Sequence, residues 1–301
     1  MLLHRLCNCD RARLLSSPLI PESASSGLWY NSDMNNYEQR SAVTNGKVAI
    51  ITGGAGEGIG HGITNSLTNA GWNVVVVDRD ESRLSKLRQS ALSQSHRIES
   101  VAIDITVPDA PQRAVECALG VFGRIDGLVN SAGVGLSKGI AEVTDEEFDS
   151  LFNIDFRAAF RFSRAVIPHL LSAGGCIINI GSIHVERSLP GFGIYGSVKA
   201  ALEAFSRGIA IDYGSRGIRS NCVHPGLVMS PQNRSLIAGF APDPDAWIEN
   251  FTRTKQLLDA QVTAAQVGDL VAWLMSPQAA AITGQSVVID GGSSAMLFGR
   301  E

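Results

Sequence analysis

Two polar side chains, Tyr195 and Lys199, lie four residues apart in a segment whose apolar residues recur with helical spacing. Residues four apart share one face of a helix, so we expect the phenol and the ammonium group to project side by side. A tyrosine with its ordinary pKa of about 10 is a poor base at neutral pH, but a neighbouring positive charge stabilises the phenolate. The pair therefore predicts a tyrosine that acts as a general acid/base.

A second chemical feature is the loop TGGAGEGIG at residues 52–60, which has five glycines in nine residues. It follows an apolar run and precedes a segment in which Ile59, Ile63 and Leu67 share one helical face before Gly71. A glycine-rich turn between a strand and a helix offers free backbone N–H groups to a phosphate and allows a pyrophosphate to approach closely. The loop therefore predicts a dinucleotide site.

Asp78 closes the next apolar run, NVVVVD. A carboxylate at this position can accept hydrogen bonds from both ribose hydroxyls of an adenosine, and it would repel a 2′-phosphate. Glu57 inside the glycine loop points the same way, so NAD is favoured over NADP. Arg79 is the counter-indication, since a guanidinium can pair with a 2′-phosphate, although an Asp-Arg step at a helix entry is more often a capped, solvated corner.

The elements that must position these residues are short β-branched runs separated by helix-length segments. The strand candidates are KVAIIT, NVVVVD, SVAID, GLVN, CIINIG, IRSNCVHPG and QSVVID. Helical crossovers between strands require a parallel sheet, and unbroken Val/Ile runs indicate strands covered on both faces. We therefore predict a single α/β domain, a Rossmann-type doubly wound sheet of about seven parallel strands with helices on both faces and a ligand site beyond their carboxyl ends.

Further motifs occur in a fixed order along the chain. They are VNSAG (129–133), INIGS (178–182), YGSVK (195–199), HPG (224–226) and a closing ITGQSVVIDGG. With Ser182 thirteen residues before Tyr195, the chain resembles the short-chain dehydrogenase/reductase family in its compact single-domain branch, over about residues 47–292. The resemblance implies an oxidoreductase in which hydride moves between a substrate carbon and a nicotinamide cofactor.

The resemblance also implies four catalytic residues. Tyr195 is the general acid/base, Lys199 also binds the nicotinamide ribose, and Ser182 hydrogen-bonds the substrate oxygen. Asn153 in LFNIDF matches the family asparagine that holds a water in a proton relay behind the lysine. The family often has a glycine three residues later, and Phe156 is a departure from that pattern.

Cofactor contacts are implied along several loops. Besides Tyr195 and Lys199 they are Gly54, Gly58, Ile59, Gly60, Asp78, Asp104, Ile105, Asn130, Val228 and Ser230. The family turn reads Thr-Gly-x-x-x-Gly-x-Gly; here Gly54, Gly58 and Gly60 keep the glycine spacing, while Thr52 lies one residue early. We interpret this as one residue added at Gly53 or Gly54. The interpretation puts in doubt the hydrogen bonds that the family threonine normally makes, here expected of Thr52.

Composition limits the remaining function classes. The 301 residues are 45% hydrophobic and 18% charged, with a formal net charge of −4 and no basic run, which argues against nucleic acid and anionic membranes as partners. No apolar stretch approaches the ~18 residues of a membrane span. Five scattered cysteines favour a reducing compartment, and no second Cys/His cluster completes a metal site at Cys7 and Cys9. We expect no metal.

Residues 1–44 lack sustained periodicity, so we predict a disordered or targeting extension there and an oxidoreductase domain at 45–301. Arginines interleaved with leucines near the start are typical of a transit peptide, although Asp10 is not. We expect a cytoplasmic protein, with a mitochondrion or another organelle as the alternative.

Within the domain, the irregular stretch at about 229–261 carries Phe240, Trp247 and Phe251, as a mobile lid over an apolar substrate pocket would. Plain helix packing would also explain these aromatics.

The sequence as a whole predicts an NAD-preferring oxidoreductase that interconverts a secondary alcohol and a ketone. One alternative is an NADPH-dependent carbonyl or 3-oxoacyl-thioester reductase, against which Asp78 argues. Another is a non-catalytic dinucleotide-binding sensor or assembly subunit, against which the intact set of Asn153, Ser182, Tyr195 and Lys199 argues. The family usually forms homodimers or homotetramers through the helix that bears Tyr195 and its long neighbour.

Overall fold

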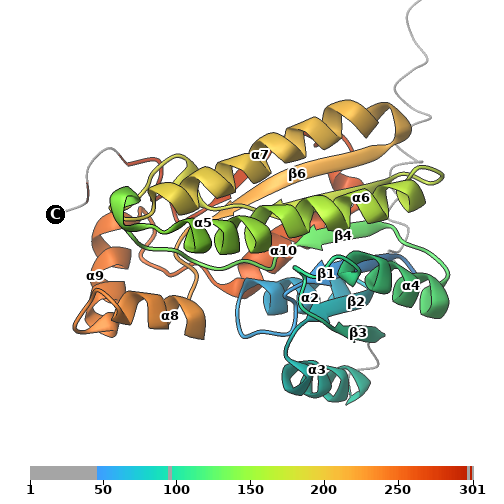
Figure 1. Cartoon of the computed structure of the whole chain (residues 1–301), viewed down its shortest axis with the longest axis horizontal. Coiled ribbons are helices and arrows are strands. Elements are labelled where there is room, and N and C mark those ends of the chain that lie inside the picture. Colours follow the sequence, from blue (N-terminus) through green and yellow to red (C-terminus); the bar gives the residue numbers. More distant parts are fainter. Residues whose placement is uncertain (1–45, 94–96, 297–298, 300–301) are drawn as a thin grey trace, which may run out of the picture. The chain divides into compact units, whose positions relative to one another are not determined.

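The computed structural model describes residues 46–93, 97–296 and 299, so the extension predicted at 1–44 lies outside the described residues. Within them, seven strands form one sheet in the order β3-β2-β1-β4-β5-β6-β7, and every neighbouring pair is parallel (Figure 1). The strands are β1 (Val48–Thr52), β2 (Asn73–Asp78), β3 (Ile98–Ala102), β4 (Gly127–Asn130), β5 (Gly175–Ile180), β6 (Ile218–Pro225) and β7 (Ser286–Ile289).

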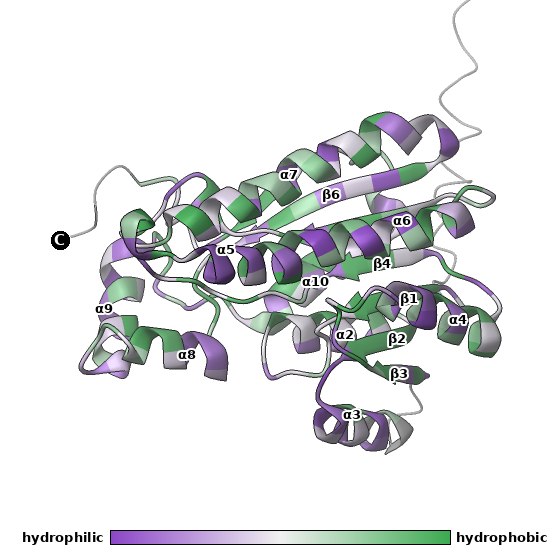
Figure 2. Cartoon of the chain, viewed as in Figure 1, coloured by the Kyte–Doolittle hydropathy of each residue, from purple (hydrophilic) through white to green (hydrophobic). Residues whose placement is uncertain are grey.

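Alternate residues of the central strands face two separate cores. Ala49 and Ile51 of β1 face one core, Val48 and Ile50 face the other, and all four are fully buried. Figure 2 shows β1 and β2 as mostly hydrophobic along their length. Burial on both faces explains why these strands are unbroken Val/Ile runs in the sequence rather than alternating patterns.

Helices cover both faces of the sheet. On one face lie α2 (Ile59–Asn69), α3 (Glu81–Ser93) and α10 (Ala264–Met275); on the other lie α4 (Ala110–Phe122), α6 (Ala158–Leu170) and α7 (Gly193–Tyr213). Short helical turns complete the connections: η1 (Ile140–Glu142), η3 (Ile183–Val185), η4 (Gly214–Arg216) and η5 (Pro277–Ala279). The predicted doubly wound fold is confirmed.

Two glycines let α2 and α10 approach to backbone contact. A Cβ added at Gly62 would lie 2.1 Å from the carbonyl oxygen of Ala264, and one added at Gly268 would lie 2.3 Å from that of Gly62. Contacts this short leave no room for any side chain at either position. The crossing fixes α2, the helix that follows the glycine loop, against the rest of the domain.

A long helix interrupted by a wider turn begins near the carboxyl edge of the sheet, in the connection after β4, and leads back to the start of β5. It begins with α5 (Asp145–Phe152), where Thr144 and Glu147 form a reciprocal capping box, as the Thr-Asp-Glu-Glu sequence predicts. It continues through the π-helical turn η2 (Asn153–Arg157) into α6. Single π-helical turns inside α-helices occur frequently at functional sites because they change the direction of the side chains.

The connection between β6 and α10 makes a long excursion from the sheet. It holds α8 (Pro231–Ala238) and α9 (Pro244–Lys255), which lie next to each other in Figure 1. Ser230 caps α8 and Asp243 caps α9 through their side chains. An isolated parallel bridge joins Val228 to Val262, so the excursion begins and ends at one point. The stretch that we expected to be irregular is therefore largely helical.

Strand order reverses at β1, which lies between β2 and β4, and such a switch point opens a crevice beyond the carboxyl ends of the strands.

In the part of the chain that the structure describes, none of the helices combines the length and the apolar character that a membrane span requires.

Candidate active site

A cavity of about 1160 Å³ lies along the carboxyl edge of the sheet. Its walls come from the loops after β1 to β6, from α8 and α9, and from the chain beyond β7. Of the predicted site residues, these line it: Gly58, Ile59, Gly60, Asp78, Asp104, Ile105, Ser182, Tyr195, Lys199, Val228 and Ser230. Three do not: Gly54, Asn130 and Asn153.

Glycines make the turn between β1 and α2 possible. Gly53 has φ +70°, and a Cβ there would lie 2.8 Å from the Cα of Ala132. A Cβ at Gly60 would lie 2.2 Å from the carbonyl oxygen of Gly53. The helix begins at Ile59 with Gly58 as its N-cap, and no side chain caps it. Its first backbone N–H groups are therefore available to an anionic ligand.

Thr52, whose hydrogen bonds the predicted insertion puts in doubt, joins the glycine turn to the loop after β4. The Thr52 hydroxyl oxygen accepts hydrogen bonds from the backbone N–H groups of Ser131, at 3.1 Å, and Ala132, at 3.2 Å. Gly53, the next residue, has a φ of +70°. The loops after β1 and β4 thus remain joined.

Gly54 and Asn130 lie behind the cavity wall rather than on it. A Cβ at Gly54 would lie 2.8 Å from the Thr64 hydroxyl oxygen, so this glycine permits the packing of β1 against α2. The buried amide of Asn130 donates to the Asn179 side chain at 2.8 Å, between β4 and β5. Both residues pack beneath the loops, and neither lines the cavity.

Asp78 lies at one end of the cavity, where β2 ends. Its carboxylate accepts hydrogen bonds from the backbone N–H groups of Ala55, at 3.3 Å, and Asp80, at 3.2 Å. These bonds hold the carboxylate beside the glycine loop. Arg79 and Arg83 also line this end of the cavity, so both charges are present there.

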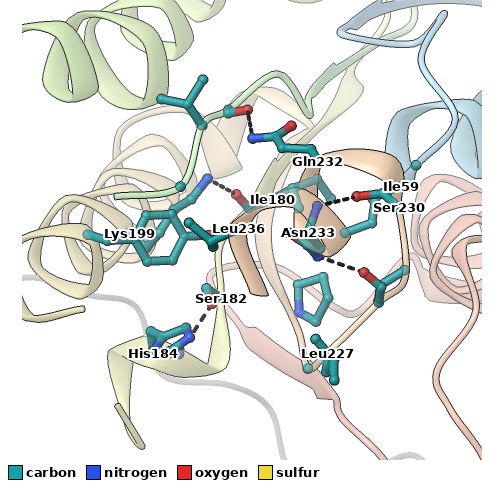
Figure 3. Close-up of a pocket in the computed structure, with 18 of the residues that line it drawn as sticks. Ile59, Ile180, Ser182, His184, Lys199, Leu227, Ser230, Gln232, Asn233 and Leu236 are labelled. Atoms are coloured by element: carbon teal, nitrogen blue, oxygen red, sulfur yellow. Dashed lines mark hydrogen bonds between the residues drawn. The ribbon is translucent and has the colours of Figure 1, made fainter. Parts of the chain in front are cut away.

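Ser182, Tyr195 and Lys199 line the other end of the same cavity. Figure 3 shows Ser182 and Lys199. Tyr195 and Lys199 lie one turn apart near the start of α7, and the Lys199 ammonium is 5.7 Å from the centre of the Tyr195 ring. It also donates a hydrogen bond to the carbonyl oxygen of Ile180 at 3.1 Å. The Ser182 side chain accepts from the His184 N–H at 3.3 Å and forms a hydrogen bond with Tyr195. The structure therefore brings the three predicted side chains together.

Asn153 does not join them. Its side-chain oxygen accepts a hydrogen bond from Arg157 one turn along the helix. The residue beside Lys199 is Asp155, whose Oδ2 lies 3.0 Å from the ammonium nitrogen. The family pattern often has a glycine three positions after this residue. Three positions after Asp155 lies Ala158, which is small and buried, whereas three positions after Asn153 lies the large Phe156. We therefore correct the assignment: Asp155, on the π-helical turn, takes the place expected of Asn153.

Burial sets the charge states of this wall. Desolvation of the ammonium lowers the pKa of Lys199, but the charges of Asp155 and Tyr195 outweigh it and raise the pKa above its ordinary value. Burial raises the pKa of Asp155, while Lys199 and the Val134 N–H oppose this rise. Burial also raises the pKa of Tyr195; the Lys199 charge opposes the rise and the Asp155 charge adds to it.

Two histidines surround Ser182. Nδ1 of the buried His224 lies 3.1 Å from the amide nitrogen of Ser182 and 2.9 Å from its carbonyl oxygen, which fixes the serine backbone. His184 stacks on Phe192 at 4.4 Å between ring centres and lies edge-on to Tyr195 at 5.6 Å. Burial lowers the pKa of His184 to about 4, so its ring is neutral at pH 7.

The rest of the cavity is bounded by α8, α9 and the chain after β7. Apolar side chains predominate there: Leu189, Phe192, Leu227, Leu236, Ile237, Phe240, Trp247, Phe251 and Met296. Trp247 stacks on Phe251 and meets Phe240 edge to face. Gln232 of α8 reaches the carbonyl oxygen of Gly133 at 3.5 Å, from the opposite loop (Figure 3). This lobe adjoins Tyr195, where a substrate would react.

The residues present fit a nicotinamide dinucleotide. Gly53, Gly58 and Gly60 keep the loop free of side chains over the uncapped start of α2, Asp78 lies at one end, and Lys199 lies at the other. Bound there, such a cofactor would supply hydride chemistry, and Tyr195 would supply or take the proton. Among the described residues, no cluster of three or more His, Cys, Asp or Glu side chains could hold a metal ion.

Known proteins share this architecture along most of the chain. The family model described as enoyl-(acyl carrier protein) reductase matches residues 54–294. L-xylulose reductase of Bos taurus is 33% identical over 256 residues, which are 82% of this chain and 96% of that protein.

Solved structures agree with these matches. The crystal structure of L-sorbose reductase from Gluconobacter frateurii complexed with NADPH and L-sorbose has a TM-score of 0.78 and 30% identity, and covers 85% of this chain and 99% of the other. A short-chain dehydrogenase/reductase from Serratia marcescens has a TM-score of 0.75 and 31% identity, with 83% and 98% covered. The chain belongs to the short-chain dehydrogenase/reductase family, oxidoreductases that act on alcohols and ketones.

Proposed function

We propose that this protein transfers hydride between a nicotinamide cofactor and a secondary alcohol or ketone, with NAD preferred over NADP and Tyr195 as general acid/base. The observation that carries the proposal is the single cavity wall that runs from Asp78 and the glycine loop to Ser182, Tyr195 and Lys199. In this proposal Ser182 holds the substrate oxygen beside the phenol, and Lys199 holds the nicotinamide ribose. The lobe formed by residues 229–261 selects the substrate.

The preference for NAD rests on Asp78, whose carboxylate is held in place by two backbone N–H groups. NADP is the second candidate, because Arg79 and Arg83 line the same end of the cavity and could pair with a 2′-phosphate. The crystal structure of L-sorbose reductase is a complex with NADPH and L-sorbose. An NADPH-dependent carbonyl reductase therefore remains the alternative enzyme.

Titration of the protein's fluorescence with NAD and NADP tests the cofactor preference. We expect NAD to bind at least about tenfold (~1.4 kcal/mol) more tightly and Asp78→Ala to erase that difference. Asp109→Ala is the matched control, since it removes the same charge at an exposed position outside the cavity wall. Tighter binding of NADP, lost in Arg79→Ala or Arg83→Ala, would instead establish the second candidate. If neither dinucleotide binds, the proposed cofactor site fails, and a non-catalytic role such as an assembly subunit becomes the better proposal.

We also propose that the protein forms a homodimer through an apolar face of α5, η2, α6 and α7. Its phenylalanines recur every four residues along the interrupted helix, at 148, 152, 156 and 160, and the last two contact Phe205 of α7. Phe148 is 41% exposed and Phe160 is 40% exposed. Exposed apolar side chains in such a row are typical of a protein interface.

Phe160→Glu is expected to shift the protein to monomers, because a second copy would have to bury the new carboxylate. Sedimentation velocity measures the change. Val121→Glu is the control, since Val121 is 47% exposed on α4. Monomers in the unmodified protein, or dimers that persist in Phe160→Glu, would contradict the proposal.

The proposed partner is a small-molecule substrate, and the proposed location is the cytoplasm, with import into an organelle as the alternative. Cys117, Cys176 and Cys222 are free, which is consistent with a reducing compartment.

A further inference from the structure

A buried ion pair lies behind the tyrosine. The Lys199 ammonium and the Asp155 carboxylate are 3.0 Å apart, and their side chains are 6% and 0% exposed. The other carboxylate oxygen accepts a hydrogen bond from the Val134 N–H at 2.9 Å. A Cβ at Gly133 would lie 2.9 Å from Asp155 Oδ2 and 3.1 Å from Lys199 Nζ, so only a glycine leaves room for the pair. Several elements therefore fix the carboxylate against the ammonium.

The pair changes the field that acts on Tyr195. An ammonium alone would stabilise the phenolate strongly, because charges interact more in a water-poor interior than in solvent. A carboxylate 3.0 Å from that ammonium cancels most of its charge, so the tyrosine faces a dipole rather than a net positive charge.

The other titratable groups near Tyr195 and Lys199 do not restore a positive charge. They are His184 on η3, His224 and Cys222 on β6, and Glu203 on α7. Burial keeps both imidazoles neutral at pH 7, since it lowers the pKa of His184 to about 4 and also lowers that of His224. Burial raises the pKa of the Cys222 thiol to about 12. Glu203 accepts a hydrogen bond from Arg207.

We propose that the Asp155 carboxylate neutralises Lys199 and so keeps Tyr195 protonated at neutral pH, which favours proton donation to a carbonyl over proton removal from an alcohol. In reduction, hydride adds to the carbonyl carbon and the phenol proton goes to the carbonyl oxygen, leaving a phenolate that takes a proton from solvent. In oxidation, the phenolate must take the hydroxyl proton first. Asp155 is thus a positioning residue that acts through Lys199 and Tyr195. The inference rests on the proposed role of Tyr195 and not on the choice between NAD and NADP.

Ultraviolet titration of tyrosinate in the protein without added cofactor or substrate tests the inference. Subtracting the titration of the matching Tyr195→Phe variant isolates the signal of Tyr195. We expect the midpoint in the unmodified protein to lie above the ordinary value of about 10. In Asp155→Asn, which keeps the shape and the acceptor for the Val134 N–H, we expect it to fall by about 1 pH unit or more.

Two further variants complete the experiment. Asp149→Asn removes an exposed carboxylate from the same interrupted helix and should leave the midpoint unchanged. Asp155→Ser, uncharged and smaller, supplies the second measurement if Asp155→Asn does not fold. A midpoint that stays the same or rises in the uncharged variants would overturn the inference.

The pH dependence of activity gives an independent reading. Alcohol oxidation rises with pH as the phenolate forms, so in Asp155→Asn the rising limb should move about 1 pH unit or more toward lower pH. If the rising limb of the pH profile stays at the same pH in an active Asp155→Asn enzyme, the inference is contradicted. If no oxidoreductase activity is found at all, the proposed function fails, whereas the tyrosinate titration still decides whether Asp155 controls Tyr195.

Discussion

Tyr195→Phe is expected to lower kcat by about 10²- to 10⁴-fold, the range over which a positioned acid/base group contributes to catalysis. The phenylalanine keeps the ring packing against His184 and Phe192 but has no proton to give. Dissociation constants for NAD and NADP should change little, because the hydroxyl is one contact of a long cavity wall. Steady-state kinetics with a secondary alcohol or ketone, together with fluorescence titration of the cofactor, measure both quantities.

Tyr213→Phe is the matched control. Tyr213 lies at the far end of the same helix, packed against the core, so loss of its hydroxyl should leave kcat unchanged. A Tyr195→Phe protein that keeps most of its activity would show that another group moves the proton, and Tyr195 would then lose its assignment.

Gly60→Ala is expected to weaken cofactor binding by at least about tenfold (~1.4 kcal/mol), because it displaces the loop that would hold the phosphates. The new Cβ would lie 2.2 Å from the carbonyl oxygen of Gly53, a separation that real side chains do not adopt. Either the start of α2 or the glycine loop must move, and the two can no longer face the same phosphate. Fluorescence titration with the preferred dinucleotide measures the loss.

Gly120→Ala is the control for this change. Nothing lies within 4 Å of a Cβ at Gly120, on α4, so this variant should bind the dinucleotide normally and unfold at a similar or slightly higher temperature. Unchanged affinity in Gly60→Ala would mean that the loop does not hold the phosphates, and the proposed cofactor site would need to be moved.

The sheet could be predicted because its strands are local, unbroken Val/Ile runs at regular intervals. Tyr195 and Lys199 could be predicted for the same reason, since their relation depends only on helical spacing. Ser182 lies two residues after the end of β5, so the position of the strand and the family motif both indicate it. Each of these residues is positioned by its own element.

Asp155 could not be placed in this way. Asn153 is the more familiar residue type for the role, and the π-helical turn that directs Asp155 toward Lys199 has no sequence pattern of its own. An acid between apolar residues, with Ala158 three positions later, was the available indication. Its meaning depends on Lys199, which another helix supplies from a distant part of the chain.

Asn130 and Gly54 were misplaced for a related reason. Both belong to motifs next to a ligand site, but a motif does not reveal whether a side chain at the end of a strand turns toward the cavity or toward the core. The helices within 229–261 were indicated by Ser230-Pro231 and Asp243-Pro244, each an N-cap followed by a proline in the first turn. These start signals are local and could have been used.

The Val228–Val262 bridge has a consequence for how this protein can change. Both ends of the excursion, at Val228 and Val262, lie side by side. A replacement segment therefore needs only to join these two positions, and the sheet need not change. Doubling the length of a flexible connection costs only about 0.6 kcal/mol in closure entropy. Segments of other lengths and sequences should therefore be exchangeable at this bridge. The chain could then acquire a different specificity while its strands, its glycine turn and the cavity residues Ser182, Tyr195 and Lys199 are inherited unaltered.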